Sequence, residues 1–177
     1  VYASCHDNHT LWDRLLENSP ETSEAEKINM HKLAQTIVLT SQGIPFLHAG
    51  TEFLRTKYGV ENSYESPDSI NKLDWSRKSD YQEVFNYYKG LIALRKNHPA
   101  FRLPNAELLA THLNFIEDTP ETLVAYQLKD HANGDTWKNI LVVLNGAAAE
   151  AEMVLPTGEW KIAANGVTIN EKGIAGK

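Results

Sequence analysis

The chain of 177 residues is 42% hydrophobic and 23% charged, and it has a formal net charge of −6 at pH 7 without a cluster of basic side chains. This balance excludes a disordered or collagen-like chain, and the lack of a basic patch argues against a nucleic-acid partner. No apolar run reaches the roughly 18 residues that a membrane span needs. The single cysteine, Cys5, excludes an internal disulfide but leaves the cellular compartment open.

The first half of the chain alternates short apolar runs with helical patterns. Apolar runs at residues 1–4 and 44–48 predict two strands, and each is followed by apolar residues at helical spacing. The predicted helices begin near Leu11, at a capping box on Ser23, and near Asp80.

Two strand–helix units amount to a quarter of an eight-stranded barrel. Parallel strands need neighbouring strands and covering helices, so two such units cannot cover their own faces. We therefore expect residues 1–103 to be the C-terminal part of an incomplete (β/α)8 TIM barrel. Val1, which lies within an apolar run, is expected to be a cut end of a longer chain.

The second part of the chain changes to the alternation that is typical of strands. Turn signals such as Asn145-Gly146 and Asn165-Gly166 separate the apolar runs. The pattern predicts an antiparallel β-sandwich domain over residues 104–177, with the domain boundary at Pro104. The predicted strands are residues 113–117, 123–129, 139–145, 150–155, 160–164 and 167–169.

The pair His6-Asp7 ends the first apolar run. In βα barrels, active sites are built at the ends of strands. A carboxylate beside an imidazole at such a place can stabilise a cationic transition state or bind a sugar hydroxyl. The alternative, which the sequence leaves open, is that Asp7 caps the short helix that begins near Thr10, because Asp is a preferred N-cap residue.

The histidines of the same cluster also raise the question of a metal site. Cys5, His6 and His9 lie close together in the sequence, and His48 or Glu52 could complete a shell. Zinc needs three or four converging ligands, and this run has no recognised ligand spacing. We therefore predict no metal site.

The loop at residues 62–75 mixes Tyr and Trp with amide and carboxylate side chains. Sugar sites use this combination, because flat apolar faces stack on sugar rings while polar groups bind hydroxyls. The alternative is a surface loop that its aromatic residues hold in place, although connecting loops of this length are uncommon without a role.

These segments resemble the α-amylase superfamily, and specifically its type I pullulanases. Residues 1–9, ending in Cys5-His6-Asp7-Asn8-His9, resemble the region after barrel strand seven of that family, and residues 43–53 resemble its strand-eight region. Residues 62–75 are similar to the pullulanase loop that follows. The resemblance covers residues 1–99 with specific motifs and continues beyond them by architecture.

The resemblance implies a retaining starch-debranching hydrolase that cleaves α-1,6 linkages in pullulan, amylopectin or glycogen. It implies that Asp7 stabilises the transition state, that His6 binds the sugar, and that Asp68 and Asn71 line the donor side of the cleft. The family's nucleophile and general acid follow barrel strands four and five, which lie outside this chain. By itself the chain is therefore expected to be inactive.

The resemblance also sets expectations for other residues and partners. Thr51 departs from the family, which has Glu at this position, so Glu52 is the matching carboxylate and is expected to be structural. The expected partner is an α-glucan polysaccharide, no cofactor is required, and Ca²⁺ is compatible with the full-length protein. A truncated barrel is expected to self-associate.

Two other readings of the sequence stay open. An isoamylase or α-amylase sibling would share His6 and Asp7 but not the loop at residues 62–75. A non-catalytic carbohydrate-binding or assembly module would bind starch without turnover.

Overall fold

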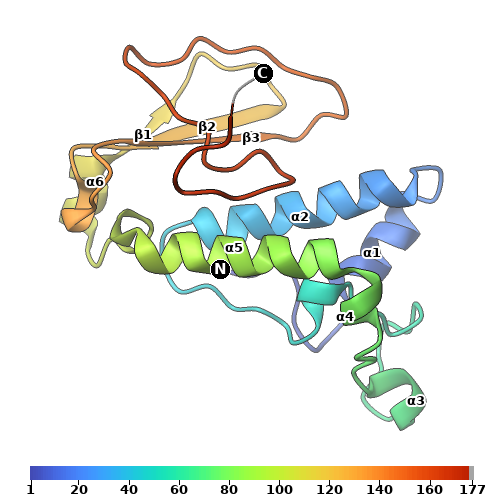
Figure 1. Ribbon diagram of the computed structural model, residues 1–177. Coiled ribbons are helices and arrows are strands. Elements are labelled where there is room, and N and C mark those ends of the chain that lie inside the picture. The colour runs from blue at the N-terminus through green and yellow to red at the C-terminus, as the bar shows by residue number, and fades with distance from the viewer. Residues whose placement is uncertain (176–177) are drawn as a thin grey trace.

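The computed structural model describes residues 1–175, and in it a pair of long helices lies beneath a small sheet (Figure 1). The helices are α2 (Glu24–Thr40) and α5 (Gln82–Asn97), which pack side by side, and α1 (Leu11–Asn18) packs against α2 at the end away from the sheet. None of the helices in this part of the chain is long and apolar enough to cross a membrane.

The capping box predicted at the start of α2 is confirmed. Glu26 donates its backbone N–H to the Ser23 hydroxyl at 3.3 Å, and the Glu26 carboxylate accepts the Ser23 backbone N–H at 3.1 Å. This reciprocal pair satisfies two backbone donors that the first helical turn leaves open. The helix ends before Gly43, which has a left-handed φ of +89° that glycine adopts without strain.

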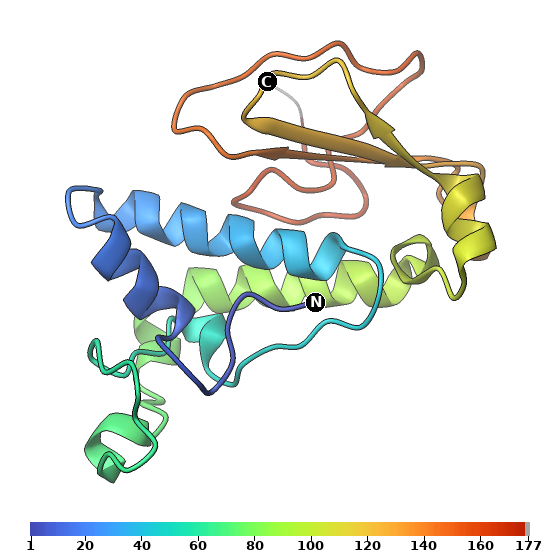
Figure 2. The ribbon, with the colours of Figure 1, turned by 180° about the vertical axis from the view of Figure 1, so that it is seen from behind.

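The two predicted barrel strands are not formed as strands. Residues 1–4 and 44–48 carry no strand assignment, although they lie side by side (Figure 2). The Val1 amino group donates to the carbonyl of Ile44 at 2.8 Å, and the N–H of Phe46 donates to the carbonyl of Val1 at 2.9 Å. Both bonds of Val1 reach the residues flanking Pro45, which is the arrangement of parallel neighbours. This pairing stops after one residue, because parallel strands depend on neighbours on both sides.

Short helical turns connect the second of these segments to α5. They are η1 (Thr51–Phe53), α3 (Asp68–Asn71) and α4 (Arg77–Asp80). The third predicted helix therefore begins as the separate turn α4, and α5 starts two residues later. After α5 come η2 (Pro99–Arg102) and α6 (Ala106–His112).

The antiparallel sheet predicted for the second part of the chain is confirmed, but the described residues form one three-stranded sheet without the second layer of a sandwich. Its strands β1 (Leu113–Ile116), β2 (Leu123–Leu128) and β3 (Ile140–Asn145) are antiparallel in the order β1-β2-β3, and η3 (Ala132–Gly134) lies between β2 and β3. The last three predicted strands are absent apart from one isolated bridge between Ala164 and Ile169. A second sheet would bury one apolar face of these runs against the first sheet. The runs do not bury such a face, since 89% of the Val154 surface, for example, is exposed.

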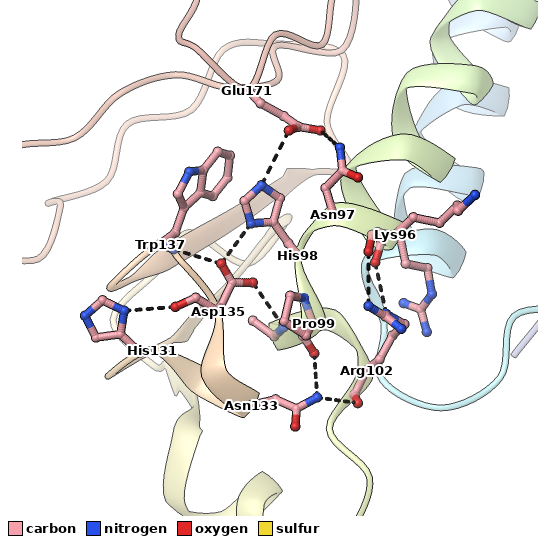
Figure 3. Close-up of polar contacts among 12 residues, drawn as sticks. Lys96, Asn97, His98, Pro99, Arg102, His131, Asn133, Asp135, Trp137 and Glu171 are labelled. Atoms are coloured by element: carbon pink, nitrogen blue, oxygen red, sulfur yellow. Dashed lines mark hydrogen bonds and ion pairs between the residues drawn. The ribbon is translucent and has the colours of Figure 1, made fainter.

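The C-terminal segment nevertheless packs onto the helices. Ile169 contacts α5 at Gly90, where an added Cβ would lie 3.0 Å from the Ile169 side chain. A polar junction also joins the end of α5 to the sheet (Figure 3). There the buried His98 donates its Nδ1–H to the Asp135 carboxylate at 2.9 Å, and its Nε2 lies 3.9 Å from the Glu171 carboxylate. The hydrophobic core under the sheet contains Phe101 as well as Leu128. The boundary at Pro104 stays a prediction.

Candidate active site

A polar cavity of ≈ 310 Å³ gathers side chains from two segments that are far apart in the sequence, residues 6–7 and residues 48–71. Three of the four predicted site residues line it, namely His6, Asp7 and Asn71, while Asp68 is not among the lining residues. The remaining lining residues are His48, Arg55, Lys57, Glu61, Asn62, Ser63 and Tyr64.

Asp7 does not cap the neighbouring helix. The N-cap of α1 is Thr10, whose hydroxyl accepts the backbone N–H of Asp13 at 3.0 Å. The Asp7 side chain is 76% exposed and meets His6, with 3.1 Å between Asp7 Oδ1 and His6 Nδ1. The capping hypothesis is therefore wrong, and the Asp7 carboxylate is available to a ligand in the cavity.

The buried Lys57 side chain makes hydrogen bonds to the turn that carries Asp7. Lys57 is 1% exposed, and its ammonium group donates to three backbone carbonyls. These are the carbonyls of Asn8 at 2.5 Å, Glu61 at 3.0 Å and His6 at 3.4 Å. Burial lowers the pKa of Lys57, while the nearby carboxylates, Asp13 foremost and then Asp7, act to raise it. The lysine thus joins the turn of residues 6–8 to Glu61, and both segments contribute to the lining of the cavity.

A buried carboxylate on α1 holds the lysine in turn. Asp13 is 2% exposed and accepts the backbone N–H of Lys57 at 2.7 Å and the hydroxyl of Thr56. Two charge-assisted hydrogen bonds to one carboxylate fix both residues firmly.

His48 and Arg55 form a second pair in the cavity wall. Burial, followed by the positive charges of Arg55 and Lys57, lowers the pKa of His48 to about 4. The imidazole is therefore neutral near pH 7, and Arg55 Nη1 lies 3.0 Å from its Nε2. Because a guanidinium group can only donate, Nε2 is the acceptor and the proton sits on Nδ1.

Arg55 also joins the segment around Ala49 to α3. Its guanidinium donates to the backbone carbonyl of Asn71 at 2.8 Å and to that of Ala49 at 3.2 Å. The Asn71 amide group donates to the carbonyls of Ser63 at 2.8 Å and Ser66 at 2.9 Å, so both of its N–H groups are used within the loop. The side-chain oxygen of Asn71 is the atom that is left to meet a ligand.

Two other residues that the sequence suggested as candidates, Glu52 and His9, make polar contacts with other parts of the chain. Glu52 accepts the backbone N–H of Gly50 at 3.0 Å. His9 turns away from the cavity, with 3.4 Å to Glu17 and 3.1 Å to the carbonyl of Gly59. Within residues 1–175, no three His, Cys, Asp or Glu side chains are placed to hold a metal ion.

Sequence reasoning missed the residues that hold the cavity together, which are Asp13, Arg55 and Lys57. The sequence Arg55-Thr56-Lys57 reads as an ordinary charged loop, and lysine side chains are usually exposed. The burial of Lys57 comes from contacts with residues 6–13, more than 40 positions away, and no local signal reports it.

Comparison with known proteins agrees with the resemblance in the sequence. Residues 110–168 match the family described as the pullulanase all-beta domain. Over 155 residues the chain is 45% identical to the pullulanase of Bacillus subtilis (strain 168), which covers 88% of this chain and 21% of that protein. An isoamylase of Flavobacterium sp. is 28% identical over 170 residues, with 83% of this chain and 22% of that protein covered.

Solved structures show the same relationship. The pullulanase from Bacillus acidopullulyticus superimposes with a TM-score of 0.96 at 46% identity over 98% of this chain and 21% of that one. The pullulanase from Paenibacillus barengoltzii in complex with maltohexaose and alpha-cyclodextrin gives a TM-score of 0.85 at 52% identity, over 88% of this chain and 24% of that one. Sequence and fold together show that the chain is similar to a segment of pullulanases, and it spans about a fifth of the length of the relatives it matches.

Proposed function

We propose that this chain is part of a longer retaining glycoside hydrolase, called the parent enzyme below, which cleaves α-1,6-glucosidic linkages in pullulan, amylopectin or glycogen. The observation that carries the proposal is the exposed Asp7 carboxylate at the polar cavity, where it has no capping role. Pullulanases align with this segment, and isoamylase is among the relatives.

In this proposal Asp7 acts by electrostatics. Retaining hydrolysis passes through an oxocarbenium-like transition state, and a fixed carboxylate near the sugar stabilises the developing positive charge. His6, held beside Asp7 at 3.1 Å, binds a hydroxyl of the same sugar. The oxygen of Asn71 accepts a hydroxyl on the opposite side of the cavity, and Asp68 in the first turn of α3 extends the donor side.

The groups that break and form bonds come from the rest of the parent enzyme. Retaining hydrolysis needs a nucleophile and a general acid about 5–5.5 Å apart. From the family resemblance we expect both to follow barrel strands four and five, and we propose a complete (β/α)8 barrel in the parent enzyme. The pair of bonds between Val1 and the segment around Pro45 is consistent with two adjacent strands of such a barrel.

The proposed substrate class follows from the relatives. Solved pullulanases include complexes with maltohexaose and alpha-cyclodextrin and with maltotetraose. We propose an α-glucan polysaccharide as the partner of this site as well. No cofactor is required, because two carboxyl groups suffice for the reaction. Calcium in the parent enzyme stays an expectation on which no step depends.

The experiment is the substitution Asp7→Asn in the parent enzyme. The two side chains are close to isosteric, so the melting temperature should barely change. Removing one preorganised electrostatic partner costs about 10²–10³-fold in rate, so kcat on pullulan should fall by this factor while KM changes little. Asp118→Asn, which changes an exposed carboxylate near the turn between β1 and β2, is the matched control and should leave kcat unchanged. A kcat within a few-fold of the parent enzyme would remove Asp7 from the mechanism.

An isoamylase-like debranching enzyme is the second candidate, because the Flavobacterium isoamylase aligns with 83% of this chain. Rates of the parent enzyme on pullulan and on glycogen, measured beside those of the two relatives, distinguish the candidates.

A further inference from the structure

We infer that Lys57 is a positioning residue for the reaction, which acts by holding the turn of residues 6–8 so that Asp7 faces the sugar. The inference rests on the proposed function, because it assumes that Asp7 acts in catalysis. Lys57 lines the cavity, but its ammonium group is bonded to backbone carbonyls of the protein.

The hydrogen bonds of the lysine bracket Asp7. Its ammonium group donates to the carbonyl of His6 at 3.4 Å and to that of Asn8 at 2.5 Å, which are the residues immediately before and after Asp7. The third N–H goes to the carbonyl of Glu61 at 3.0 Å. An ammonium group has three donors and here all three are used, so its position is defined from three directions.

The backbone of the turn needs such a contact. Asn8 has a φ of +60°, in the left-handed region. Asparagine tolerates this conformation better than most residues, but it does not enforce it. Without a partner for the carbonyls of His6 and Asn8, the peptide that carries Asp7 is free to rotate. The lysine selects the one conformation in which both carbonyls point inward and the Asp7 side chain points outward.

The lysine is itself rigidly placed. Asp13 of α1 accepts its backbone N–H at 2.7 Å and the hydroxyl of Thr56, so the backbone at Lys57 cannot move without breaking these bonds. The negative charge of Asp13 also favours the charged form of the Lys57 ammonium group. The position of α1 thereby determines the position of Asp7, through the bonds of Asp13 and Lys57.

The test is Lys57→Met in the parent enzyme, which keeps the length of the side chain but removes the three donors and the charge. A displacement of about 1 Å at a reacting group costs about 10²-fold in rate. We expect kcat to fall by about that factor while KM stays within about threefold.

Lys27→Met is the matched control for stability. Lys27 is also buried and donates to a backbone carbonyl, that of Thr22 at 2.5 Å, but it lies outside the cavity. Both variants should lower the melting temperature, and only Lys57→Met should lower kcat. If Lys57→Met does not yield folded protein, Lys57→Gln, which retains an N–H donor one atom closer to the backbone, should fold and still lose kcat.

The double variant Asp7→Asn/Lys57→Met separates positioning from general destabilisation. If Lys57 acts through Asp7, the double variant should have the kcat of Asp7→Asn alone, because residues that act as a unit are not additive. Multiplicative losses, or a kcat of Lys57→Met within about threefold of the parent enzyme, would overturn the inference. If Asp7→Asn alone left kcat unchanged, the proposed function would fail instead.

Discussion

His31 on α2 is expected to make the stability of this chain depend steeply on pH. The side chain is completely buried between Trp12 and Tyr88, with ring centroids at 6.4 and 5.9 Å. Its Nδ1 shares a hydrogen bond of 3.1 Å with the Tyr88 hydroxyl, and the structure shows no partner among residues 1–175 for its Nε2. Burial lowers the pKa of His31 from 6.5 to about 3, because the apolar surroundings disfavour the charged imidazolium.

The sign of the effect follows from proton binding. Between pH 6.5 and pH 3 the unfolded chain binds a proton at this histidine and the folded chain does not, so acid favours unfolding. Each pH unit below the unfolded pKa costs about 1.4 kcal/mol. At pH 5 the loss in unfolding free energy is about 2 kcal/mol relative to pH 8, and near pH 3 it reaches about 4 kcal/mol.

The comparison protein is His31→Asn, whose amide oxygen can accept the Tyr88 hydroxyl near the place of Nδ1. The smaller side chain leaves a cavity, but that cost is the same at every pH. Urea unfolding of both chains, followed by tryptophan fluorescence at pH 8, 6.5 and 5, gives the two dependences. The unmodified chain should lose about 2 kcal/mol more than the variant between pH 8 and 5, because the contributions of His48 and the carboxylates are common to both. Parallel curves would refute a buried neutral His31.

Two further predictions concern the chain by itself. The 177-residue chain should show no turnover of pullulan, because the proposed nucleophile and general acid lie outside it; product formation proportional to its concentration would contradict this. It should also self-associate through residues 1–4 and 44–48, where Ile44 is 86% and Phe46 51% exposed. Phe46→Glu should then shift sedimentation velocity toward monomer while the control Val154→Glu does not, and a monomer at all concentrations of the unmodified chain would exclude the association.

Local signals in the sequence predict the helices well. The capping box at Ser23 and the apolar stripe that includes Val84, Tyr88 and Leu91 are interactions within one helix or between one helix and the core, and all are present. The central strand β2 is also predicted. Its apolar alternation holds in part, because Tyr126 and Leu128 are buried while Val124, which alternates with them, lies at the surface.

Strands that depend on distant partners could not be predicted in the same way. The run at residues 150–155 alternates like β2, yet it remains unpaired because no neighbouring strand lies beside it. Alternation reports that a segment can form a strand, whereas pairing decides whether it does. The same reason applies to residues 1–4 and 44–48, whose pairing ends after Val1.

The candidate site depends both on local sequence motifs and on long-range contacts. His6, Asp7 and Asn71 were predicted from motifs and share one cavity, but the contacts that place them are long-range. The bond from Lys57 to Asn8 spans 49 positions and the bond from Lys57 to Asp13 spans 44.

These contacts all lie within this segment of the proposed parent enzyme. Asp13 follows Trp12, which is buried in a core cluster with Leu54 and Tyr88, so the docking of α1 fixes the carboxylate that holds Lys57. The placement of Asp7 therefore depends on the packing of α1, α2 and α5 beneath the cavity. A substitution that loosens α1 should displace Asp7 even though it lies outside the cavity, whereas the exposed run at residues 150–155 has no such connection to the site.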